Sequence, residues 1–217
     1  MRIWSGQPEY LYEKLKIEKI LHCDPTQSEL ITKCGFGPAY DWLVEQMLSH
    51  VGLPPIGVKY PFWAWHTLEW KRQKPDLRRR EFRAYNGDQA CIELEIPDKD
   101  VLLSNEDMWH IVLTDGYYGD CSNKQEYEAE DAWYESLAPD ERICVKQKSW
   151  EKISDVFPPF ENEWESHGKY IQATFWELHL DQVVAVRHFK GRKGNIESKK
   201  ICKTNVQASN NEENYKA

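Results

Sequence analysis

The sequence predicts an α+β fold in which a small, mostly antiparallel sheet packs with helices in a single domain. Segments with strand periodicity do not alternate regularly with helical segments, as they would in a doubly wound sheet. Their order is a strand, two helices, two strands, further helices and a closing pair of strands. With a length of 217 residues and no internal repeat, the chain is predicted to form one globular domain over residues 1–190.

The N-terminal half contains the clearest periodic segments. A short strand at residues 2–5 precedes a helix that Pro8 opens, because proline fits the first turn of a helix. Residues 38–50 predict a helix, since apolar side chains recur three and four positions apart. Aromatic residues 60–66 and the alternating residues 90–96 predict two strands.

Helices dominate the region that follows. Ser104 is a favourable N-cap residue, so a helix is predicted to begin at about Asn105. Residues 126–137 predict an exposed helix within the acidic segment 122–138, which is interpreted as a lid, an interface or an insertion without a role. A short helix is predicted over residues 149–155.

The closing segments predict the end of the domain. Residues 170–178 and 182–189 are two strands separated by a few residues, so they are predicted to pair as an antiparallel hairpin. Residues 191–217 are polar and have little to bury, so they are predicted to form a disordered C-terminal tail.

Charge and composition narrow the classes of function. A formal net charge of −8 disfavours general affinity for nucleic acid or for an anionic membrane. The longest apolar run falls far short of the roughly 20 residues that span a bilayer, and no apolar leader opens the chain. The six cysteines and seven histidines never fall at metal-ligand spacings. These patterns predict a cytoplasmic protein without a metal site or membrane partner.

The aromatic strand at residues 60–66 carries candidate ligand-binding residues. Trp63 and Trp65 share one face of this strand, and His66 lies on the other. Two indole rings on one face suit a planar ligand. The alternative interpretation is an aromatic strand of the core.

A basic segment follows between residues 71 and 83, which include seven Lys or Arg residues. Guanidinium groups such as that of Arg78 bind phosphate, and neighbouring aromatic rings stack on bases. This mixture suits nucleic acid or a phosphorylated cofactor. The alternative is a solvated loop whose basic side chains pair with carboxylates.

Three polar residues are candidates for catalysis. His110 is a candidate general base because histidine titrates near neutral pH. Gln172 and Glu177 lie on opposite faces of the penultimate predicted strand, so each would line a cleft separately. The alternative is that all three are surface or packing side chains.

Several widely spaced segments of the chain occur together in one order. They are Ile3-Trp4-Ser5-Gly6-Gln7, Ala39 to Met47, Pro61-Phe62-Trp63-Ala64-Trp65, Lys74 to Arg78, Ile96-Pro97 with Val101 to Ser104, Trp109-His110, Ser149 to Ile153, and Ile171 to Trp176. This set of segments resembles a family of bacterial proteins called domain of unknown function 3841. The likeness extends over about residues 2–190. It implies a single domain and brings no catalytic residue with it.

The order of elements is also similar to that of ADP-ribosyltransferase-type folds. That likeness implies NAD in a cleft, a His or Arg on the first strand, and a Glu or Gln late in the chain. The first strand here has Trp4 and Gln7 in place of the His or Arg, and Gln172 or Glu177 matches the late position.

Two hypotheses of different classes follow. The first is an NAD-binding protein of ADP-ribosyltransferase type, active or inactive. In it Trp63 and Trp65 stack the ligand, Arg78 holds phosphate, and Gln172 or Glu177 orients a ribose hydroxyl. This hypothesis predicts that Trp63, Arg78 and Gln172 line one cleft, and His66 is a further candidate ligand-binding residue. The second is a non-enzymatic module that binds nucleic acid or protein through the basic segment 71–83.

Overall fold

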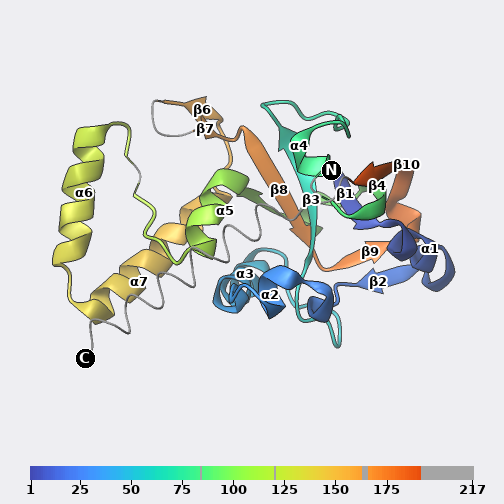
Figure 1. The fold of residues 1–217 in the computed structure, drawn as a ribbon. Coiled ribbons are helices and arrows are strands. Elements are labelled where there is room, and N and C mark those ends of the chain that lie inside the picture. The colour runs from blue at the N-terminus through green and yellow to red at the C-terminus, as the bar shows by residue number, and fades with distance from the viewer. Residues whose placement is uncertain (84, 120, 163–165, 192–217) are drawn as a thin grey trace. The chain divides into compact units, whose positions relative to one another are not determined.

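The computed structural model describes residues 1–83, 85–119, 121–162 and 166–191 (Figure 1). These residues form two compact units, each built from separate stretches of the chain. The first unit comprises residues 1–64, 74–101 and the chain from Thr174 onward, and the second comprises residues 65–73 and 102–173. The predicted tail, residues 191–217, lies outside the described residues except for Gly191.

The first unit holds the N-terminal strands and most of the long sheet strands. Its elements are β1 (Arg2–Pro8), α1 (Glu9–Glu18), β2 (Ile20–His22), a 3-10 turn (Pro25–Gln27), α2 (Glu29–Thr32), α3 (Gly37–His50), the start of β3 (Phe62–Leu68), α4 (Arg80–Arg83), β4 (Gly87–Glu95), a 3-10 turn (Asp98–Asp100), β9 (Glu177–His179), a 3-10 turn (Leu180–Gln182) and β10 (Val183–Gly191).

The second unit is mostly helical. Its elements are the end of β3, β5 (Leu102–Asn105), α5 (Glu106–Leu113), α6 (Lys124–Ser136), α7 (Pro139–Trp150), a 3-10 turn (Glu151–Ser154), β6 (Phe160–Glu161), β7 (Ser166–His167) and most of β8 (Tyr170–Phe175).

The main sheet has the strand order β10-β4-β1-β3-β8-β5. β4 pairs antiparallel with β1 on one side, where Ile3 lies opposite Leu94, and antiparallel with β10 on the other. Two small sheets, β2 with β9 and β6 with β7, are also antiparallel. The predicted α+β class with a mostly antiparallel sheet is therefore confirmed.

Apolar periodicity explains the helix that covers the core of the first unit. On α3, Tyr40, Leu43 and Met47 are all buried, as spacings of three and four residues require. Gly52, with a φ of 110°, follows its C-terminal end, where glycine adopts a left-handed conformation without strain. The predicted helix over residues 38–50 is confirmed.

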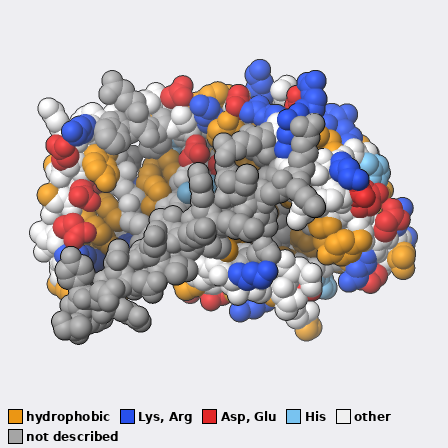
Figure 2. Space-filling model, viewed as in Figure 1, with side chains coloured by type: hydrophobic (Ala, Val, Ile, Leu, Met, Phe, Trp, Pro, Cys, Tyr) orange, Lys and Arg blue, Asp and Glu red, His pale blue; other side chains and the backbone are white. Residues whose placement is uncertain are grey.

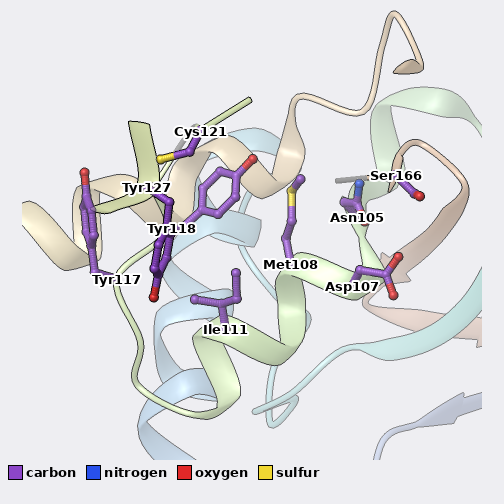
Figure 3. Close-up of a pocket in the computed structure, with 10 residues that line it drawn as sticks. Asn105, Asp107, Met108, Ile111, Tyr117, Tyr118, Cys121, Tyr127 and Ser166 are labelled. Carbon is purple, nitrogen blue, oxygen red and sulfur yellow. The ribbon is translucent and has the colours of Figure 1, made fainter. Parts of the chain in front are cut away.

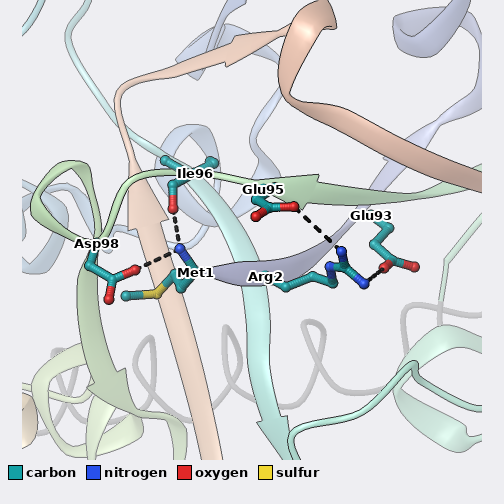
Figure 4. Close-up of polar contacts among 6 residues, drawn as sticks. All are labelled: Met1, Arg2, Glu93, Glu95, Ile96 and Asp98. Carbon is teal, nitrogen blue, oxygen red and sulfur yellow. Dashed lines mark hydrogen bonds and ion pairs between the residues drawn. The ribbon is translucent and has the colours of Figure 1, made fainter.

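Polar contacts join the start of β1 to the end of β4 (Figure 4). The terminal amine of Met1 donates to the carbonyl of Ile96 and lies 2.6 Å from the carboxylate of Asp98. Arg2 lies 3.3 Å from Glu93 and 3.4 Å from Glu95. Such partly exposed ion pairs contribute little, so the buried apolar faces of the two strands supply most of the stability.

The predicted hairpin of residues 170–178 and 182–189 is wrong. Residues 170–175 form β8, which lies between β3 and β5 in the sheet, whereas β10 pairs with β4. Between them the chain makes the short strand β9, which pairs with β2. Periodicity assigns a strand its buried face but not its partner, and this explains the error.

Two predicted helix boundaries in the second unit also differ. Ser104 belongs to β5, and the N-cap of α5 is Asn105. The predicted helix at 149–155 is the end of α7 followed by a 3-10 turn. α7 begins at Pro139 and buries only Ser149 and Trp150, so its apolar pattern is too weak to predict. In the part of the chain that the structure describes, no helix is long and apolar enough to cross a membrane.

Candidate functional site

A pocket of about 350 Å³ lies within the second unit (Figure 3). It is lined by Asn105, Asp107, Met108, Ile111, Tyr117, Tyr118, Gly119, Cys121, Tyr127 and Ser166. In the view of Figure 3 the four residues Tyr117, Tyr118, Tyr127 and Cys121 form one end, which we call the tyrosine end. Asn105, Asp107 and Ser166 form the other, the polar end, with the α5 side chains Met108 and Ile111 between.

The tyrosine end is held by hydrogen bonds between the loop after α5 and helix α7. The backbone N–H of Tyr118 donates to the hydroxyl of Ser149 at 3.0 Å. The indole N–H of Trp150 donates to the carbonyl of Gly116 at 2.7 Å. Because Ser149 and Trp150 are the two buried residues of α7, this helix positions the tyrosine loop.

A carboxylate of helix α6 is hydrogen-bonded to two residues of the tyrosine end. Glu130 of α6 accepts hydrogen bonds from the Tyr117 hydroxyl at 2.6 Å and from the Cys121 thiol at 2.8 Å. Burial, together with the hydrogen bond to Glu130, raises the pKa of Tyr117, so the phenol stays protonated at neutral pH. A Cβ at Gly119 would lie 3.1 Å from this carboxylate, so glycine permits the close approach.

The polar end of the pocket includes the side-chain amide of Asn105, which makes no hydrogen bond to the described residues. The residue is fully buried. Neither its Oδ1 nor its Nδ2 has a hydrogen-bond partner among the described residues. Buried polar side chains are normally paired, so an amide left unpaired on a pocket wall is unusual.

Asp107 and Ser166 complete the polar end. Partial burial raises the pKa of the Asp107 carboxyl, and the neighbouring Glu106 raises it further. The Ser166 hydroxyl donates to Glu161 at 2.9 Å. Asp107 is the single formally charged residue among the described residues that line the pocket. The pocket therefore combines aromatic and aliphatic walls with a few polar groups, as small-molecule sites do.

The candidate residues of the first unit are not in this pocket. Trp4 is a buried β1 residue whose Nε1 has no partner among the described residues. Gln7 donates to the Ser5 hydroxyl at 2.8 Å. The Trp63 ring lies edge-on to Tyr40, with centroids 6.1 Å apart.

Arg78 is also engaged within the first unit. Its guanidinium donates to both carboxylate oxygens of Asp76, at 2.8 to 3.2 Å, while remaining highly exposed. These hydrogen bonds hold the pKa of Asp76 well below its usual range. The contact matches the alternative interpretation, in which a basic side chain of this segment pairs with a carboxylate.

Glu177 lies in a small histidine cluster on β2 and β9. Its carboxylate is 2.7 Å from Nε2 of His22 and 3.2 Å from Nε2 of His179. Burial opposes ionisation of Glu177, but the two histidine contacts outweigh it and lower the pKa. Among the described residues, no group of three or more His, Cys, Asp or Glu could hold a metal ion.

The candidates in the second unit are mostly packed against neighbours. Trp65 lies edge-on to Tyr170, with centroids 6.5 Å apart. His66 is buried, and its Nδ1 is 2.9 Å from the Thr67 hydroxyl. The exposed His110 bonds to Glu106 at 3.0 Å, and this contact raises the pKa of His110. Gln172 is half-buried, and its Oε1 has no partner among the described residues.

Sequence reasoning did not select any of the residues that line the pocket. Asn105 precedes a helix, where asparagine is expected to cap, so nothing in the sequence marks it as a ligand-binding residue. The adjacent pair Tyr117-Tyr118 after α5 is the one sequence feature that draws attention to the tyrosine end. The predicted cleft of Trp63, Arg78 and Gln172 stays a prediction.

Comparison with known proteins gives one match. A family model described as "Domain of unknown function (DUF3841)" matches residues 2–184. No curated protein and no solved structure gives a significant match.

Proposed function

Since the chain belongs to the family described as domain of unknown function DUF3841, we propose, from the pocket of its second unit, that it binds a small planar ligand. The observation that carries this proposal is the lining, in which three tyrosines, Met108 and Ile111 surround a few polar groups. The volume of about 350 Å³ lies at the lower end of the range for small-molecule sites. It suits one ring system with its substituents rather than a whole dinucleotide.

We propose NAD, held in the pocket by its nicotinamide ring alone, as the ligand to test first. The likeness of element order to ADP-ribosyltransferase-type folds supports NAD, and a nicotinamide ring matches the planar, partly polar pocket. The proposal covers binding and not a transferase reaction, since Trp4 and Gln7 replace the first-strand His or Arg of those enzymes. The proposed setting is the cytoplasm of a bacterium, which rests on composition and on the family resemblance.

The test measures the thermal stability of the protein with and without NAD. A ligand that binds only the folded state at a hundredfold excess over Kd adds about 2.7 kcal/mol, a shift of a few degrees in Tm. Tyr127→Leu removes the half-exposed aromatic ring of Tyr127 from the pocket wall, so we expect NAD binding about fivefold weaker.

The matched control is Tyr10→Leu, which changes a similarly exposed tyrosine of the first unit. Its affinity for NAD should equal that of the wild type. The absence of a shift with NAD, or an equal loss in both variants, would contradict the proposed site.

A second candidate function is supported by the exposed basic side chains of the first unit. Lys74, Arg78 and Arg83 are exposed, and Figure 2 shows Lys and Arg side chains gathered in the region of α4. Arg187 of β10 donates to the carbonyl of Pro75 at 2.8 Å and so holds the loop that carries Lys74 and Arg78. This surface suits the phosphates of a single-stranded nucleic acid.

A further inference from the structure

Asn105 is the N-cap residue of α5, a position at which an asparagine side chain can bond to the backbone of the first helical turn. Asparagine at an N-cap normally accepts a hydrogen bond from a backbone N–H of the first helical turn. Here the backbone of Asn105 has the extended N-cap conformation, with φ −73° and ψ 123°, but its side chain makes no capping bond. The Asn105 amide therefore does not cap α5.

Asn105 lines the polar end, next to Asp107 and Ser166 (Figure 3). Asn123 shows the contrast within the same unit, since it caps α6 by accepting from the N–H of Glu126 at 3.0 Å. Both polar atoms of the buried Asn105 amide are without a partner among the described residues, so a ligand edge is the group that would complete them.

The unused atoms define the chemistry of that edge. An asparagine side chain presents a carbonyl acceptor and an amino donor side by side in one plane. The complementary group has a donor and an acceptor at the same spacing. A primary carboxamide and a ring lactam both provide this pair, whereas a ketone provides only an acceptor.

The charges around the polar end disfavour a carboxylate in the same place. Asp107 lines the pocket, and no Lys or Arg is among the described lining residues. Lys169 is near enough to influence Asp107, but its ammonium also lies 3.6 Å from Glu161. A ligand anion would face the Asp107 carboxylate without a basic lining residue to receive it.

We propose that Asn105 selects ligands whose planar ring carries a neutral amide edge, and rejects the matching carboxylic acids and ketones. The inference rests on the proposed function, because it assumes that the pocket is a ligand site. It adds the chemical class of the ligand and names the residue that selects it.

The first test compares three probes that share one ring: nicotinamide, nicotinic acid and 3-acetylpyridine. Their Kd values for the wild-type protein are measured by calorimetry or by ligand-observed NMR at neutral pH. Nicotinamide should bind at least about tenfold more tightly than the acid or the ketone, which corresponds to about 1.4 kcal/mol.

A variant then assigns the selectivity to Asn105. Asn105→Leu keeps a similar volume and removes both polar atoms, so nicotinamide should bind at least about tenfold more weakly, with the preference over the ketone abolished. The control Gln125→Leu makes the same amide-to-leucine change at an exposed α6 position outside the lining, and should retain the preference.

The outcomes separate this inference from the proposed function. Equal Kd values for the three probes, or an unchanged preference in Asn105→Leu, would overturn the role of Asn105 while NAD binding that depends on Tyr127 still supports the pocket. Failure of all three probes to bind would also overturn the inference. Failure of NAD in the thermal test is the result that bears on the pocket itself.

Discussion

At the scale of single residues, Asn105 combines a structural cost with a position on the pocket wall. Leaving a buried polar group unpaired costs about 1–3 kcal/mol, and a forgone N-cap bond costs about 1 kcal/mol more. Trp4, Ser104 and Gln172 also bury a polar atom without a partner among the described residues, but they do not line the pocket. A cost located on the wall of the proposed binding site is the pattern expected where function opposes stability.

The stability of Asn105→Leu tests this trade-off directly. Leucine has a similar volume and needs no hydrogen bond, so the free energy of unfolding should rise by about 1 kcal/mol. Urea denaturation of the ligand-free protein measures the change, with Gln125→Leu as the control that should alter stability by less than about 0.5 kcal/mol. A clearly destabilised Asn105→Leu would indicate that the amide has a structural partner.

At the scale of elements, the histidine cluster joins β2 to β9, a pairing of only three residues on each strand. Hydrogen bonds from His22 and His179 favour the ionised form of Glu177. The pKa of Glu177 is therefore lower in the folded protein than its ordinary value of 4.5. This carboxylate thus makes the short strand pair sensitive to acid.

The direction of that sensitivity follows from linkage. A depressed folded-state pKa contributes stability that is present above pH 4.5 and is lost as the pH falls through the folded value. Glu177→Gln should therefore be less stable than the wild type by about 1 kcal/mol at pH 7. The difference should shrink as the pH falls below 4.5.

Urea denaturation over that pH range measures the difference. Glu18→Gln is the control, because Glu18 is half-exposed in a 3.6 Å pair with Lys14 and such pairs contribute little. A gap between wild type and Glu177→Gln that stays constant with pH would contradict the assignment.

At the scale of the whole molecule, the net charge and the local basic surface oppose each other. A chain of net charge −8 repels nucleic acid at long range, so any binding must come from the exposed basic side chains at short range. Each phosphate that these groups neutralise releases counterions, which makes the affinity fall as salt rises.

The salt dependence of binding therefore tests the second candidate function. The affinity for a single-stranded oligonucleotide, measured by fluorescence anisotropy, should fall at least tenfold between about 50 and 200 mM salt. The double variant Lys74→Ala with Arg83→Ala should reduce the salt slope by about 1–2, whereas Lys14→Ala with Lys124→Ala should leave it unchanged. Binding that ignores salt, or the same loss in both double variants, would rule out this surface.

The sequence by itself determined the family, the α+β class and the elements whose periodicity is local. The helix at residues 37–50 and the strand at 87–95 follow from the spacing of their own apolar residues, which no distant partner alters. The tertiary structure alone decided which strands pair and which side chains meet. β10 pairs with β4, and Asn105, Tyr127 and Ser166 share a pocket although up to 61 residues separate them along the chain. Periodicity specifies which face is buried but carries no information about what that face will contact, and for that reason the candidate site emerged only from the folded chain.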